Sequence, residues 1–173
     1  MSTVERTIVL KHTIDGDDEV VRVPEYYPTD AVVFLHFDPS TRAFMFEQRT
    51  NKEDVLYGKT VIPGGKIQDP GELGTPLWAL RSEQMEECGI VPETVVYLGE
   101  DGEAGRVRLF CFLTVGTLYG ELTNREPDKH KLIWLPEEEV FHNGDIKINP
   151  IFELGTTQRI LMRAHKEMVR LGI

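Results

Sequence analysis

Hydrophobic and polar positions alternate in short runs through the first half of the chain. Thr7 to Ile14 and Glu19 to Val23 flank a turn rich in aspartate and glycine, which predicts an opening β-hairpin. The runs AVVFLHF, at 31–37, and AFMFEQR, at 43–49, are rich in β-branched and aromatic residues and enclose a polar turn. We expect these two runs to form paired strands in the core.

Further strands are predicted at 60–62, 94–98, 107–117 and 131–135. The last part of the chain changes to a helical period and predicts an amphipathic helix over Thr157 to Leu171, with Ile160, Leu161, Ala164 and Met168 on its apolar face. At 173 residues with 40% apolar residues, and with no internal repeat or linker, the chain is expected to form one domain over residues 1–173.

One helix can be located from the residues at its ends. Thr75 is a good N-cap, Pro76 suits the first helical position and Gly89 suits the position after the last helical residue. The helix is therefore predicted to span Pro76 to Cys88. A pair of glycines precedes it and predicts a tight turn at that point.

Three glutamates stand close together near the end of this helix. At 100° per residue, Glu83, Glu86 and Glu87 share one narrow face, with the small side chain of Ala79 beside them. The opposite, broader face is apolar and holds Leu77, Leu80, Met85 and Cys88.

An acidic helix face has two interpretations. It can be an ordinary solvated surface. However, carboxylates four residues apart repel each other, and no Lys or Arg lies on this face to offset the repulsion. A bound Mg²⁺ or Mn²⁺ ion would supply the missing positive charge, because hard divalent cations prefer carboxylate oxygens and leave positions for water and phosphate.

Charge and composition limit the partners. The formal net charge is −10, with 29 acidic and 19 basic residues, which argues against a duplex nucleic acid partner. No apolar run is long enough to span a bilayer and no signal sequence is evident, so we expect a cytoplasmic protein with no membrane partner. Cys88 and Cys111 are isolated and are expected to be reduced and structural. His36 and His130 are also too isolated to indicate metal ligands.

The segments PGGKIQDPGE and EQMEECGI together resemble the Nudix box, G-x5-E-x7-R-E-U-x-E-E-x-G-U, in which U is a bulky aliphatic residue. Five positions match at the family's spacing: Glu83, Glu86, Glu87, Gly89 and Ile90. The strands predicted around the box also resemble the family in order and spacing. The sequence is therefore identified as similar to the Nudix hydrolases.

The sequence departs from the box in two ways. Ser82 stands at the family's arginine position and Gln84 replaces an aliphatic residue, while Arg81 points about 100° away on an ideal helix. The spacing from Gly65 to Glu72 is one residue longer than in the family, and the next spacing is two residues longer. These departures leave open a Nudix-fold regulatory module that binds nucleotide with impaired catalysis.

The resemblance implies an α/β/α sandwich in which a mixed β-sheet lies between helices. It also implies divalent-metal-dependent hydrolysis, with Mg²⁺ or Mn²⁺, of a nucleoside diphosphate linked to another moiety. The segment NREPDKHKLIWLPEEEV resembles members that hydrolyse nucleoside triphosphates, so the expected reaction converts a nucleoside triphosphate or modified nucleotide into the monophosphate and pyrophosphate. ADP-ribose and dinucleoside polyphosphates are alternative substrates. We expect a monomer or homodimer.

Site residues follow from the same resemblance. The expected metal ligands are Glu72, Glu83, Glu86 and Glu87, and one of the helix glutamates can also serve as general base. Glu103 and Glu126 are alternative bases from more distant loops, although either can be ordinary surface. The expected substrate-binding residues are Arg49, Gly64, Gly65, Lys66 and Trp134. For Arg49 a salt bridge at the strand end, and for Trp134 a place in the core, are equally good interpretations.

Overall fold

A computed structural model describes residues 5–11, 18–24, 30–67, 76–103, 107–142, 145–146 and 155–173. Within these residues the main sheet has seven strands, in the order β11-β4-β3-β9-β8, with β5 paired to β4 and β6 paired to β3. Its strands are β3 (Asp30–Asp38), β4 (Ala43–Arg49), β5 (Thr60–Val61), β6 (Gly64–Lys66), β8 (Thr94–Glu103), β9 (Val107–Val115) and β11 (His130–Pro136). The sheet is mixed, because β3 and β9 run parallel and the other pairs are antiparallel.

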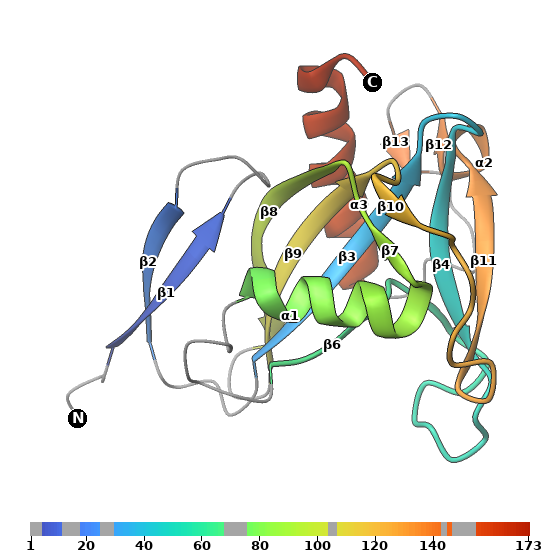
Figure 1. The fold of residues 1–173 in the computed structure, drawn as a ribbon, viewed down its shortest axis with the longest axis horizontal. Helices are drawn as coiled ribbons and strands as arrows, with labels where there is room; N and C mark the ends of the chain where they lie inside the picture. Colours follow the sequence, from blue (N-terminus) through green and yellow to red (C-terminus); the bar gives the residue numbers. More distant parts are fainter. Residues whose placement is uncertain are drawn as a thin grey trace.

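Helices cover both faces of this sheet (Figure 1). One face carries α1 (Pro76–Glu83), which continues directly into the π-helix η1 (Gln84–Cys88). The opposite face carries α3 (Gly155–Leu171). The predicted α/β/α sandwich with a mixed sheet is therefore confirmed.

Alternation along the central strands builds one apolar cluster under each helix layer. In β3, Phe34 packs in the cluster beneath α1, whereas Leu35 packs in the cluster that contains Ile160 and Leu161 of α3. Successive side chains of a strand point to opposite faces, so one buried strand supplies both clusters. The predicted apolar face of the terminal helix is confirmed, since all four of its expected residues are buried.

Smaller elements surround the sandwich. The predicted hairpin is confirmed by β1 (Glu5–Lys11) and β2 (Asp18–Pro24), which pair antiparallel, although its turn lies outside the described residues. The sequence reasoning missed several short elements: β7 (Ile90–Val91), β10 (Tyr119–Gly120), α2 (Glu137–Val140), β12 (Phe141–His142) and β13 (Asp145–Ile146). None of the described helices is both long enough and apolar enough to cross a membrane.

The glycine pair is part of a strand and not of an isolated turn. Gly64 and Gly65 belong to β6, which pairs antiparallel with Val32 and Val33 of β3. Neighbouring groups lie so close to the backbone of Gly64 and Gly65 that there is no room for a side chain at either position. Glycine is therefore required at this point of the sheet. This pairing holds the segment beside the helix that carries the three glutamates.

Candidate active site: a carboxylate cluster between helix and sheet

The acidic helix has the predicted bounds at 76 and 88, but its second half is wider than expected. From Gln84 onward the turn is π-helical, with hydrogen bonds reaching one residue further than in an α-helix. The three glutamates therefore differ in burial, although they still lie close together, because the charge of Glu86 acts on Glu83 and the charge of Glu83 acts on Glu87. Glu83 is half-buried, Glu86 is exposed, and Glu87 is buried at 5% exposure.

Two other residues of this helix differ from the expected pattern. Ala79 is buried in the apolar cluster and does not border an open acidic face. Gln84, at a position where the family has an aliphatic residue, is fully buried and donates a hydrogen bond from Nε2 to Thr114 Oγ1 at 3.1 Å. Thr114 lies on β9, so this bond ties the first residue of the π-turn to the sheet.

Glu87 meets an acidic residue that the sequence reasoning missed, Glu47 of β4. Glu47 is 1% exposed and its carboxyl group interacts directly with that of Glu87. Burial, followed by the nearby charge of Glu126, raises the pKa of Glu47 to about 7. Burial, followed by the charge of Glu47, raises the pKa of Glu87 to about 10. The sequence did contain a signal for Glu47: it follows Met45 by two positions, so both side chains lie on the same face of the strand and Glu47 was a candidate for burial.

Arg49 and His130 lie beside Glu47 without fully satisfying it. Arg49 NH1 is 3.4 Å from Glu47 Oε2, but the same guanidinium bonds Asp54 Oδ2 through Nε at 2.8 Å and NH2 at 2.7 Å. His130 Nε2 is 3.3 Å from Glu47 Oε1 without hydrogen-bond geometry. Arg49 therefore makes the strand-end salt bridge that the sequence allowed, and its contact with phosphate stays a prediction.

Glu126 reaches the same cluster from the loop before β11. Burial is the largest cause of the raised pKa values of Glu47, Glu83 and Glu87, and the charge of Glu126 adds to each of them. Lys129 pairs with it at 2.5 Å and offsets part of that charge. The structure thus places Glu126, predicted as a candidate base, near Glu83 and Glu87. Glu103, the other candidate, ends β8, which two strands separate from β4, and its side chain lies outside the described residues.

The glycine pair permits close contact on both sides of β6. A Cβ at Gly65 would lie 2.0 Å from Glu83 Oε1, and one at Gly64 would lie 2.1 Å from the Val32 carbonyl oxygen. Gly65 therefore lets the Glu83 carboxylate lie against the backbone of β6, in line with the close approach that the sequence suggested for this pair. Lys66 follows them and is exposed.

The remaining predicted residues lie outside the cluster or at its edge. Ser82 donates a hydrogen bond to Glu86 Oε1 at 2.9 Å, so a hydroxyl contacts this glutamate where the family has a guanidinium. Trp134 lies on β11 and borders a separate cavity with His36. Glu72 and the N-cap Thr75 lie outside the described residues.

The carboxylate cluster suits a hard divalent cation. Buried Glu47 Oε1 and Glu87 Oε2 have no hydrogen-bond partner, an arrangement that is costly unless a cation is bound or a proton is shared. As placed, no three acidic, histidine or cysteine side chains in the described part of the chain are arranged to coordinate one ion. The charges of Glu83 and Glu126 act on the buried Glu87, so these three carboxyl groups lie close enough to interact. Glu47 lies within the same group.

Comparison with known proteins agrees with this geometry. A model of the NUDIX domain family matches residues 27–154, which is more than half of the chain. The chain belongs to the Nudix family. A search among curated protein sequences found no match.

Several solved structures share the Nudix fold of this chain. An ADP compounds hydrolase is 18% identical with a TM-score of 0.65, over 99% of this chain and 92% of that chain. A MutT NUDIX hydrolase from Burkholderia pseudomallei is 20% identical with a TM-score of 0.58, over 78% and 96% of the two chains. The NUDIX domain of Shewanella oneidensis NrtR, complexed with ADP ribose, is 15% identical with a TM-score of 0.57, over 82% and 87%. At these identities the likeness concerns the fold.

Proposed function

We propose that this Nudix protein is a divalent-metal-dependent pyrophosphohydrolase that cleaves a nucleoside diphosphate linked to another moiety. The observation that carries the proposal is the convergence of Glu47, Glu83, Glu87 and Glu126 between η1 and the sheet, with two buried oxygens unpartnered. Ionising two carboxyl groups that are buried together costs stability, and a bound cation would stabilise their ionised forms.

Each residue then has a distinct part in the reaction. Glu83, Glu87 and Glu126 would hold Mg²⁺ or Mn²⁺, which when bound screens the pyrophosphate charge and lowers the pKa of an attacking water. Arg49 and Lys129 keep the surrounding charge from becoming wholly negative. Gly65 allows the polyphosphate to approach the backbone next to Glu83.

Two substrate classes remain distinct within this proposal. Nucleoside triphosphates, giving the monophosphate and pyrophosphate, are supported by the resemblance of segment 124–140, which contains β11. ADP-linked compounds are supported by a different observation, because the likeness to the ADP compounds hydrolase extends over 99% of this chain. The NrtR domain is also complexed with ADP ribose.

A substrate panel tests the proposal and separates these classes. The four common nucleoside triphosphates, ADP-ribose and a diadenosine polyphosphate are incubated with Mg²⁺, and the products are separated by anion-exchange chromatography. We expect one class to be cleaved at the phosphoanhydride, with activity lost after exhaustive chelation and restored by Mg²⁺ or Mn²⁺.

Matched variants show whether the cluster is responsible. Glu87→Gln removes a buried carboxylate of the cluster, whereas Glu138→Gln removes an exposed one from α2. We expect Glu87→Gln to lower kcat by at least 100-fold and Glu138→Gln to leave it unchanged. Full activity after chelation would refute the metal-dependent mechanism. Tight nucleotide binding without turnover of any substrate would instead support the regulatory module suggested by Ser82.

A further inference from the structure

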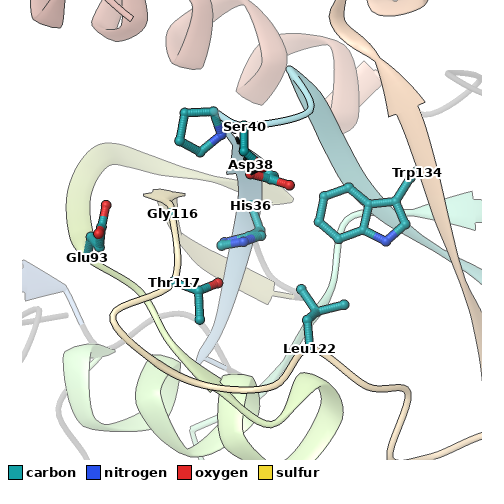
Figure 2. A pocket seen from close by; sticks show the side chains of 9 residues that line it. His36, Asp38, Ser40, Glu93, Gly116, Thr117, Leu122 and Trp134 are labelled. Carbon is teal, nitrogen blue, oxygen red and sulfur yellow. Dashed lines mark hydrogen bonds between the residues drawn. The ribbon is translucent and has the colours of Figure 1, made fainter.

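A cavity of about 400 Å³ lies on the α1 side of the sheet, apart from the carboxylate cluster. The strand register shows how the cavity lies relative to the cluster. Two cavity residues, His36 and Trp134, pair with Met45, which precedes Glu47 by two positions on the same face of β4, whereas Glu47 itself pairs with Leu132. Figure 2 shows Trp134 and Leu122 facing Thr117 and Glu93 across His36, with Asp38 beside them. Such a volume suits a small organic molecule and is far larger than a single ion needs.

The charges around this cavity select against anions. Its lining contains the carboxylates of Asp38 and Glu93 and no Lys or Arg. Although partial burial opposes it, hydrogen bonds from Ser40 and Thr41 hold the pKa of Asp38 below its usual value, so this group is charged at neutral pH. The half-buried indole of Trp134 adds an aromatic wall, and aromatic rings next to carboxylates favour organic cations.

His36 presents an unpaired nitrogen to the cavity. The side chain is 1% exposed, and its Nδ1 lies 3.0 Å from Thr114 Oγ1. Among the described residues nothing hydrogen-bonds its Nε2. Burial lowers the pKa of His36 to about 4, so the ring is neutral at pH 7. When Nδ1 donates to Thr114, Nε2 carries the lone pair and can accept a hydrogen bond from a ligand N–H.

We propose that this cavity is an effector site for a small planar organic cation of the amidinium or guanidinium type. The cation would donate an N–H to His36 Nε2, lie against Trp134, and balance the charges of Asp38 and Glu93. Nucleotide phosphates do not fit this site, because its charged groups are both acidic. The site is therefore distinct from the substrate site of the proposed hydrolase.

A chain of buried hydrogen bonds connects the cavity with the catalytic helix. His36 contacts Thr114, and Thr114 accepts a hydrogen bond from Gln84, the first residue of η1. The π-turn that begins at Gln84 also carries Glu87. A cation bound at His36 Nε2 would keep the proton on Nδ1, so that His36 donates a hydrogen bond to Thr114. Because Thr114 also bonds Gln84, this would restrain η1, the turn that carries Glu87.

Tryptophan fluorescence tests the binding. The chain has two tryptophans, so Trp78→Phe leaves Trp134 as a single reporter at the cavity. Benzamidinium is titrated without metal or nucleotide, beside the neutral isostere benzamide and the anion benzoate. We expect a saturable change with benzamidinium, binding at least 10-fold weaker with benzamide, and none with benzoate. Equal binding of benzoate, or no saturation with benzamidinium up to 20 mM, would overturn the site.

Surface variants check the position of the bound cation. Glu93→Gln removes one exposed carboxylate and should weaken binding about 2- to 5-fold. Thr117→Arg places a competing cation at the mouth and should abolish binding, whereas Thr117→Gln should not. Glu100→Gln, exposed on β8 and outside the lining, serves as the control for charge. Equal affinity in the Thr117→Arg and Thr117→Gln variants would contradict this location.

Hydrogen exchange tests the link to the catalytic helix. We expect benzamidinium to slow exchange of the amides at 84–88 at least 3-fold in the parent protein. Gln84→Met removes the donor to Thr114 at similar side-chain volume, and should retain binding while losing this protection. Binding without altered exchange in the parent protein would overturn the effector role. None of these measurements requires hydrolysis, so their failure is distinguishable from failure of the proposed function.

Discussion

The contact between Glu47 and Glu87 predicts that replacing Glu87, a residue of the proposed active site, will stabilise the metal-free protein. Both carboxyl groups are buried, and the pKa of Glu87 is raised to about 10 from an ordinary value of 4.5. The folded state then holds a proton that the unfolded state has released, so stability is full below the ordinary pKa and is lost as the pH rises towards the raised value. Glu87→Gln keeps the size of the side chain and its ability to donate to Glu47, but does not titrate.

The magnitude follows from this linkage. While Glu87 keeps its proton in the folded state, each pH unit above 4.5 lowers stability by about 1.4 kcal/mol. Between pH 5 and pH 8 the ceiling is about 4 kcal/mol, and rotation of the carboxyl group towards water reduces it to roughly 2 kcal/mol. In a chain of this size that corresponds to a Tm about 4–8 °C higher for Glu87→Gln than for the parent at pH 8.

Thermal unfolding in EDTA at pH 5 and pH 8 measures the difference. The advantage of Glu87→Gln should be near zero at pH 5 and appear at pH 8. Glu86→Gln is the control, because Glu86 is exposed and its replacement should change stability by no more than about 0.5 kcal/mol. Saturating Mg²⁺ should raise the Tm of the parent more than that of Glu87→Gln. A Glu87→Gln variant less stable than the parent at pH 8 in EDTA, or a difference independent of pH, would refute the reasoning.

Four further substitutions test the site and the strand beside it. Ser82→Arg supplies the guanidinium of the family and should lower the Mg²⁺ concentration for half-maximal rate; an unchanged or higher requirement means that this chain orients its carboxylates by other contacts. Gly65→Ala should displace the Glu83 side chain and lower kcat at least 10-fold, while the free energy of unfolding changes by less than about 1 kcal/mol. In Gly64→Ala the new methyl group meets backbone atoms, so the free energy of unfolding, measured by chemical denaturation, should fall by about 2–3 kcal/mol. Glu126→Gln should lower kcat/KM at least 10-fold while the far-ultraviolet circular dichroism stays unchanged; an active variant would place the loop outside the site.

Periodicity along the chain determined most of the fold. The runs at 31–37 and 43–49 became β3 and β4 because β-branched and aromatic side chains on both faces require a strand buried on both sides. The terminal helix followed equally well from its apolar spacing, and the ends of the acidic helix from Pro76 and Gly89. Hydrophobic periodicity and the residue types at helix ends are local features, so they can be read from the sequence without the fold.

Tertiary structure decided the chemistry of the site. The π-turn begins at Gln84, whose side chain bonds Thr114, thirty residues away in sequence, and no helical period anticipates this contact. Glu47 becomes a candidate site residue only because the sheet places it next to Glu87. The sequence by itself determined that carboxylates gather near one helix and which family they resemble. The folded chain decided which of these carboxyl groups are buried between helix and sheet. Their raised pKa values follow from this burial, because desolvation depends on neighbours that only the folded chain brings together.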